Sequence, residues 1–426
     1  MENLIKSELL KNSKLVVKKA SEKNVCDLSP SYKTAMNNAL SFFDERGLPS
    51  KKDEDWKYTS IAKNLSHHFY EQKESIIHNV PTEVLDQRGM IIFNNGIFNK
   101  FLSVLPHGFE IDALEIKDQF FDAFDSLNYG VAFSAISLKI KKNTVLDFPV
   151  TIIHLVDDAA VNKIVSPRLT ITAESFSKVS FLEFFICTKR ELLQYSTNAV
   201  THFILQENAS LEHVLIQTEA KNAIHIGLTE ADLFKGSHFQ SMTLDFGLLT
   251  ARHNLCINLR ETGAEASAHG LFALDKNDHV DIFSTIIHHA PHTTSNQLFK
   301  GILNGDSHGV FTGKIIVKKD AQQSHSSQLN KNLLLSKKAH IDTRPQLMVH
   351  ADDVKCSHGA TIGQLSKDEE FYLETRGISK ERAKQILCHG FATEVLYLID
   401  NSSIKSFALK MLLLYFEKSE TSSTKK

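Results

Sequence analysis

The sequence predicts a mainly β protein whose central part is a β-helix or β-solenoid, with α-helical segments at both ends. Between residues 139 and 363, short β-branched and aromatic runs alternate with polar corners such as Glu207–Ala209, Lys319–Ala321 and Lys337–Ala339. No helical spacing interrupts these runs, whereas the parallel strands of a βαβ sheet need crossovers of a dozen or more residues. Apolar residues at helical spacing occur on both sides of this region.

The N-terminal segment, residues 4–68, has helical apolar spacing. Its predicted apolar face consists of Met36, Leu40 and Phe43. We expect Ser31 to cap the start of this helix and Gly47 to end it in a left-handed conformation. The only tryptophan, Trp56, follows in a turn-rich segment, and we expect its ring to pin that loop to the body of the protein.

The central region fits a coil of stacked rungs, because each rung can bury its apolar face only when the next rung covers it. A β-sandwich is the alternative, since the runs show no strict period.

Helical spacing returns in the C-terminal segment. Ser366 and Glu369 form a capping box, and Gly377 can close that short helix. Two further helices are predicted, with apolar faces made of Ala383, Ile386, Leu387 and Phe391, and of Ile404, Ala408, Met411 and Tyr415. This end can cap the solenoid or dock a partner, and the last segment, SETSSTKK, is expected to be disordered.

Composition limits the function. Hydrophobic residues make up 42% of the 426 residues and charged residues 23%, and 48 Lys plus Arg face 50 Asp plus Glu, for a formal charge of -2. We therefore expect no binding to nucleic acid by bulk electrostatics. No signal sequence and no run of 18 apolar residues occurs, so we expect no membrane association and a cytoplasmic location. Five widely spaced cysteines without a C-x-x-C pair fit a reducing compartment.

Common catalytic motifs are missing. The sequence has no G-x-x-x-x-G-K-[ST] loop, so we expect no nucleotide to be bound by this chain itself. It also lacks G-x-G-x-x-G, G-x-S-x-G and H-E-x-x-H. These absences argue against the commonest dinucleotide, hydrolase and metalloprotease sites, and we expect the chain not to be an enzyme.

The densest group of chemically active residues lies in the segment VHADDVKCSHGATIGQL. On an extended strand, one side carries Asp352, Val354, Cys356 and His358, and the other carries Asp353, Lys355 and Ser357. A thiol and an imidazole about 7 Å apart suit iron or zinc, but two strand neighbours cannot complete a coordination sphere. Further ligands would have to come from elsewhere, such as a second chain. The alternatives are that Cys356 packs as a small hydrophobe and that His358 is a hydrogen-bonded corner residue.

Other polar clusters carry less chemistry. His288 and His289 are adjacent on a predicted strand and therefore point to opposite faces, so with His292 they are expected to line the surface or the stack. A second group, interpreted as a solvated edge, consists of Asp275, His279 and Asp281.

Several segments between residue 54 and about residue 395 resemble the SufB/SufD family of iron-sulfur cluster assembly proteins, and the SufD branch in particular. The matching segments are Glu54–Thr59, His289–Pro291, Lys300–Gly301, Gly309–Lys314, Asp352–Thr361, Phe371–Leu373 and Arg376–Ile378. The SufB branch has E-H-E-A-T where this chain has Ser357–Thr361, which favours SufD and removes the glutamates beside the histidine.

The resemblance implies a right-handed parallel β-helix flanked by helical domains. With the periodicity of the chain, we expect an N-terminal helical domain at 1–80, a connecting segment at 81–138, the β-helix core at 139–365 and a C-terminal helical domain at 366–426. The resemblance further implies a complex of one SufB, one SufD and two copies of the ATPase SufC, with an ATPase docked on each C-terminal helical domain. In this chain the docking residues would be Phe371, Tyr372, Arg376 and Phe391.

We therefore expect a non-catalytic scaffold subunit in which His358 meets a SufB cysteine at the subunit interface, with Cys356 as an auxiliary ligand. Iron or a nascent iron-sulfur cluster would be held there transiently and shared with SufB. A homodimer is an alternative state of the isolated chain. The rival functions are a stand-alone β-helix enzyme, such as a polysaccharide lyase or a metal-dependent hydrolase, and a purely architectural partner that never touches iron.

Overall fold

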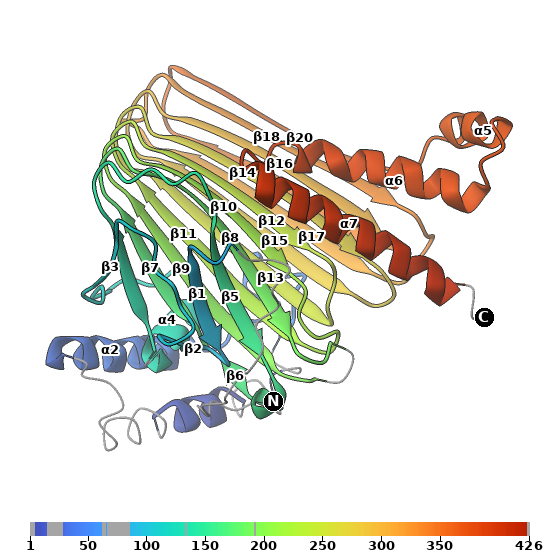
Figure 1. Cartoon of the computed structure of the whole chain (residues 1–426). Helices are drawn as coiled ribbons and strands as arrows, with labels where there is room; N and C mark the ends of the chain where they lie inside the picture. The colour runs from blue at the N-terminus through green and yellow to red at the C-terminus, as the bar shows by residue number, and fades with distance from the viewer. Residues whose placement is uncertain are drawn as a thin grey trace.

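The protein is a two-sheet parallel β-solenoid with helices from both termini of the chain packed against its outer faces, as the computed structural model shows (Figure 1). The structure describes residues 5–14, 29–61, 65, 86–132, 134–190 and 193–423. The sequence prediction of a solenoid is confirmed, and the β-sandwich alternative is wrong, because consecutive rungs pair in parallel and in register. Cys26 and the last three residues of the chain lie outside the described residues.

From residue 168 onward, each solenoid strand pairs with the strand two positions further along the chain, so two sheets grow together. The first sheet consists, in order, of β2 (Ile97–Phe98), β1 (Met90–Asn94), β5 (Val150–Val156), β8 (Lys178–Cys187), β10 (Ser210–Gln217), β12 (His238–Asp245), β14 (Glu265–Leu274), β16 (Thr294–Leu303), β18 (Ser324–Leu334) and β20 (Val354–Gly363). The second consists of β19 (His340–Val349), β17 (His308–Val317), β15 (His279–His288), β13 (Thr250–Leu259), β11 (Ile224–Leu233), β9 (Ser196–Leu205), β7 (Arg168–Ala173), β4 (Ile136–Ile140) and β3 (Phe109–Asp112), with β6 (Ile164–Val165) beside β9.

The polar corners predicted from the sequence are where the chain crosses between the sheets. Asn208 lies between β9 and β10 with φ of 56°, and Gln323 lies between β17 and β18 with φ of 57°. This left-handed conformation is costly for most side chains but is tolerated well by asparagine. Turn chemistry at the corners therefore permits each rung to fold back over the previous one.

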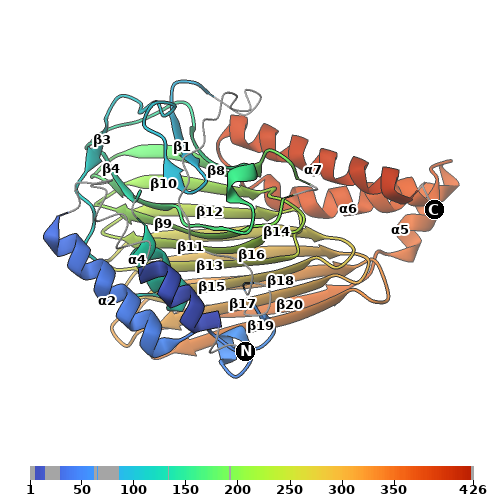
Figure 2. The ribbon, with the colours of Figure 1, turned by 90° about the horizontal axis from the view of Figure 1, so that it is seen from below.

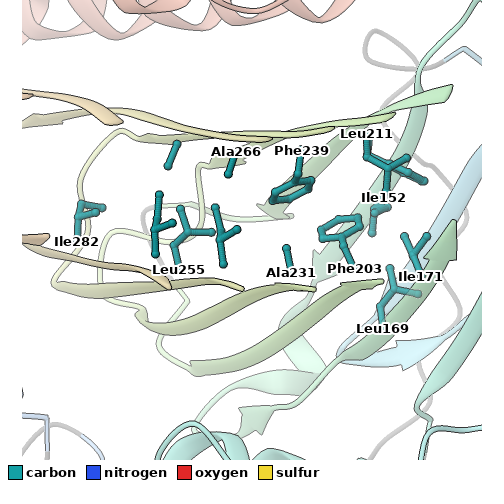
Figure 3. Close-up of a cluster of buried hydrophobic side chains, with 14 of the residues drawn as sticks. Ile152, Leu169, Ile171, Phe203, Leu211, Ala231, Phe239, Leu255, Ala266 and Ile282 are labelled. Atoms are coloured by element: carbon teal, nitrogen blue, oxygen red, sulfur yellow. The ribbon is translucent and has the colours of Figure 1, made fainter. Parts of the chain in front are cut away.

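The core fills the space between the two sheets (Figure 3). Phe203 on β9 and Phe239 on β12 pack against each other inside it, with tilted rings whose centroids are 5.3 Å apart, and both side chains are fully buried. Equivalent positions of successive rungs lie directly above one another, so one inward apolar residue per rung produces a continuous hydrophobic column.

Two C-terminal helices, α6 (Lys380–Leu396) and α7 (Ser402–Ser423), cover the outer face of the first sheet, while α5 (Lys367–Thr375) projects beyond it. Ser366 caps α5 by accepting the amide of Glu369, and Gly377 follows its end with φ of 82°, as predicted. The predicted inner face of α6 is wrong at Ile386, which is exposed, because Cys388 and not Ile386 packs against the solenoid.

The C-terminal helix differs from the sequence prediction in its length. Helix α7 continues to Ser423, so most of the segment expected to be disordered is helical in the described residues. Among these residues, no helix is long and apolar enough to cross a bilayer.

The outer face of the second sheet carries α2 (Pro30–Arg46), the short 3-10 helix η1 (Glu54–Trp56) and α4 (Ala123–Val131), while a second 3-10 helix, η3, spans Asp158–Ala160. Met36, Leu40 and Phe43 are buried on α2, as predicted. The N-cap of α2 is Ser29 and not Ser31, because Pro30 begins the helix and its lack of an N–H suits the first position.

The two ends of the solenoid differ (Figure 2). At the end nearer the N-terminus, the antiparallel strands β2 and β3 terminate the sheets. At the other end, the last strands β19 and β20 have no further strand on their outer edges among the described residues. The solenoid is therefore closed off by local structure at one end and open at the other.

Candidate functional site

The open end of the solenoid carries the residues singled out by the sequence. Strand β20 pairs with β18 on one side only, and its neighbour across the lumen, β19, is also an edge strand. Exposed apolar side chains lie on both strands, namely Met348, Val349 and Ile362. An unpaired strand edge with exposed apolar residues is a ready template for pairing with another chain.

The register of β20 places Cys356 and His358 on the same face, as predicted. Cys356 lies beside Ser326 and His358 beside Gln328, and both β18 residues are buried inside the lumen. His358 therefore belongs to the lumen-facing row of the last rung, where no other rung in the described part of the chain covers it, and it is exposed. Asp352 precedes the strand in a bend and does not extend the row.

Cys356 has a mixed environment. It is half-buried and packs beside a small apolar cluster that contains Ile315, Val317 and Ala351. Burial raises the pKa of the Cys356 thiol. The thiol form is thus favoured at neutral pH, which makes this cysteine a weaker metal ligand than a free thiolate.

A polar column beneath these two residues was missed by the sequence reasoning. Ser295 donates to or accepts from Ser326 at 2.6 Å, directly below Cys356 in register. Below His358 lie Gln328 and then Gln297, both buried, whose side-chain amides have no hydrogen-bond partner among the described residues. This column could have been predicted from the sequence, because polar residues occupy alternating positions of β16 and β18.

The histidine cluster at the end of β15 divides as predicted. His288 is fully buried in the lumen, where it bonds the hydroxyls of Thr293 at 2.8 Å and Ser295 at 2.9 Å. His289 points away and lies 3.2 Å from Asn258. Burial lowers the pKa of His288 to about 4, so the ring is neutral at physiological pH. These histidines do not form a common site.

The interpretation of Asp275, His279 and Asp281 as a solvated edge is wrong for the last two. Asp281 is buried and forms an ion pair with the buried Arg252 at 2.6 Å. Thr59 donates its hydroxyl proton to Asp281 at 2.5 Å and accepts the Nε2 proton of His279 at 3.0 Å. The cause is the segment Glu54–Thr59, which covers this part of the second sheet.

The covering segment is held by aromatic and charged contacts. The guanidinium of Arg252 lies 4.0 Å from the ring centroid of Trp56 and donates to the carbonyl of Asp55 at 2.8 Å. Lys314 and Arg344 bind Asp55 and Glu54, each at 2.6 Å. The expectation that Trp56 pins a loop to the body is confirmed, whereas its long-range partners could not be predicted from local spacing.

The C-terminal candidate residues fall into two groups. Phe371 and Tyr372 are exposed on α5, which has no buried residue and projects beyond the solenoid (Figure 1). Arg376 lies over Tyr372 at 5.3 Å from its ring centroid. Phe391 instead faces the sheet, where its ring lies 4.2 Å from the ammonium of Lys300. Phe391 thus helps to attach α6, while the other three are accessible.

Comparison with known proteins gives consistent similarities. Residues 154–391 match the family described as "SUF system FeS cluster assembly, SufBD core domain". The chain is 31% identical over 386 residues to an iron-sulfur cluster assembly SufBD family protein of Synechocystis, which covers 84% of this chain and 85% of that protein. It is 26% identical over 378 residues to the iron-sulfur cluster assembly protein SufD of Escherichia coli, over 85% of this chain and 88% of that protein. It is 32% identical over 246 residues to the chloroplastic protein ABCI7 of Arabidopsis thaliana, over 57% of this chain and 51% of that protein.

Proposed function

The chain belongs to the SufBD family of iron-sulfur cluster assembly proteins, and from this premise we propose that it is a non-catalytic scaffold subunit that works beside a SufB-like paralogue and a SufC-like ATPase. The observation that carries the proposal is the position of His358, exposed on the lumen side of an edge strand at the open end of the solenoid. A ligand in this position can complete a site only together with a second chain.

The partner surface in this proposal is the edge formed by β19 and β20. A paralogue with the same rung geometry can continue both sheets by strand addition, in which main-chain hydrogen bonds provide affinity. Exposed Met348, Val349 and Ile362 supply apolar area for such contact. A second copy of this chain can use the same edges when the partner is absent, which gives the homodimer.

The cargo of the site is iron or a nascent iron-sulfur cluster. His358 would offer a neutral imidazole nitrogen, a donor that suits iron, and the paralogue would contribute a sulfur ligand. Cys356 serves only as an auxiliary ligand, because burial raises the pKa of its thiol. Below the histidine, the side-chain amides of Gln328 and Gln297, which have no hydrogen-bond partner among the described residues, make this end of the lumen polar.

The ATPase is proposed to dock on the C-terminal helices. Exposed Phe371 and Tyr372 with Arg376 offer an aromatic and cationic patch on α5, whereas Phe391 acts from inside by holding α6 to the solenoid. Nucleotide would be bound by the ATPase and not by this chain. The four described cysteines are free, which suits the reducing cytoplasm as the place of assembly.

The decisive experiment is co-expression with the paralogue and the ATPase, followed by anaerobic reconstitution and absorption spectroscopy. His358→Ala should leave the complex assembled and abolish most of the cluster absorption, while His107→Ala, at another exposed histidine, should change neither. Normal cluster yield in the His358 variant would favour the purely architectural role. Turnover of a substrate by the isolated chain would favour the stand-alone enzyme, which family membership does not support.

A further inference from the structure

Three histidines occupy equivalent positions at the start of three successive rungs of the second sheet. His279, His308 and His340 begin β15, β17 and β19 and are paired with one another in register. Their rings lie one above the other in a row that we call the histidine stack, tilted relative to one another, with centroids 4.8 Å and 5.2 Å apart. All three lie on the outer face of the sheet, since the next residues along β17 and β19, Gly309 and Ile341, point into the core.

The innermost histidine of this stack is already engaged. His279 donates through Nε2 to Thr59 of the covering segment, and it is partly buried there. Its ring packs against His308 and so fixes the orientation of that neighbour. Two imidazoles, those of His308 and His340, remain toward the open end of the solenoid.

These two imidazoles converge on one carboxylate. The Nε2 atom of His308 lies 2.8 Å from Oδ2 of Asp342, and the Nε2 atom of His340 lies 3.3 Å from the same oxygen. One ligand atom from each of the three residues lies within 4.8 Å of the other two. An ion with ligand distances of about 2.0 to 2.2 Å brings its ligand atoms to roughly 3 to 4 Å from one another, so small rotations of these side chains suffice.

Exposure of the group leaves room for an ion and its water. The side chain of His340 is 66% exposed, that of His308 is 31% exposed and that of Asp342 is 23% exposed. The Asp342 carboxylate thus lies between the imidazole of His308, which packs against His279, and the exposed imidazole of His340. Interactions between exposed polar side chains contribute little to stability, so the approach of two imidazoles to one carboxylate oxygen is not needed to hold the fold together.

We propose that His308, His340 and Asp342 form a binding site for a divalent first-row transition metal ion. Two imidazoles and one carboxylate with open positions are the donor set typical of non-haem Fe²⁺, and the same donors also suit Zn²⁺. The site is separate from His358, because it lies on the outer face of the other sheet. It gives this chain a place to hold a metal ion that needs no ligand from a partner.

Cobalt titration of the full-length chain tests the proposal. Chelator-treated protein is titrated with Co²⁺, followed by its visible absorption, and the bound Co²⁺ is then displaced with Zn²⁺ or, anaerobically, with Fe²⁺. Two variants each alter one ligand: His340→Ala removes the exposed imidazole, and Asp342→Asn removes the carboxylate charge while keeping the shape of the side chain. His107→Ala is the control at another exposed histidine. His358→Ala is included to separate this site from the one proposed at the solenoid end.

We expect wild-type protein, His107→Ala and His358→Ala to share a saturable Co²⁺ site, and each ligand variant to bind at that site at least about tenfold more weakly. Co²⁺ should also raise the unfolding temperature of wild-type protein but not that of the ligand variants, because only an intact site links binding to folding. Far-UV circular dichroism verifies that the variants are folded. Equal binding by wild-type protein and both ligand variants, or a loss confined to His358→Ala, would overturn the proposal.

Discussion

Removal of the Asp281 charge should detach the segment Glu54–Thr59 from the solenoid. The Asp281 and Arg252 side chains are 2% and 1% exposed and meet at 2.6 Å, so Asp281→Asn leaves a buried guanidinium without its counter-ion. Breaking a buried pair by removing one partner costs about 3 to 5 kcal/mol. Arg252 keeps its contacts with Trp56 and with the carbonyl of Asp55, so we expect about 3 kcal/mol, the lower end of this range.

The chain offers a local reporter for this change. Trp56 is the only tryptophan and is buried against Arg252, so its fluorescence follows the covering segment, while far-UV circular dichroism follows the solenoid. In urea, with a slope of roughly 2 kcal/mol/M, 3 kcal/mol corresponds to a fluorescence midpoint about 1.5 M lower. The circular dichroism transition should move less, because the solenoid strands keep their pairing.

The matched control is Asp306→Asn. Asp306 pairs with Lys338 at 3.0 Å, but both side chains are well exposed, and such pairs contribute about 0 to 1 kcal/mol. If Asp281→Asn lowered the Trp56 midpoint no more than Asp306→Asn, burial of the ion pair would not be what holds this segment.

Three further changes test other parts of the structure. The pKa of His288 is lowered to about 4 by burial, so the unfolded chain binds the proton first and stability falls between about pH 6.5 and pH 4. The unfolding temperature of His288→Gln should depend less on pH in this window than that of wild-type protein or His107→Gln, and equal slopes would refute the assignment. Lys300 is fully buried and donates to a carbonyl and a carboxylate of α6. Lys300→Met should therefore lower the free energy of unfolding by about 1 to 3 kcal/mol and accelerate amide hydrogen exchange in α6. Unchanged exchange would show that apolar packing alone holds this helix. A Cβ at Gly313 would collide with the side-chain amide of Gln328, so Gly313→Ala should lower the stability to urea unfolding. Adding Gln328→Ala to this variant should restore part of the lost stability. If the effects of the two substitutions were simply additive, the collision would not be the cause.

Local patterns were sufficient for the elements of the fold. Short β-branched runs with polar corners predicted a solenoid, and capping residues such as Ser366 predicted a C-terminal helix, because these signals act between near neighbours in the chain. Period-two alternation likewise put Cys356 and His358 on one face of their strand. Prediction failed at Ser31, where the choice between two nearby serines depended on Pro30.

The residues themselves determined that this chain stacks rungs, carries helices at its ends and has a thiol and an imidazole side by side on a strand. Only the tertiary structure decided which strands are edges, which acids are buried and which histidines meet. Asp281 is buried because Thr59 and Trp56, more than 200 residues away, fold over it, and His308 meets Asp342 because a rung closes between them. The physical reason is that stacking brings together residues one or more rungs apart, and no local spacing records which of them become neighbours.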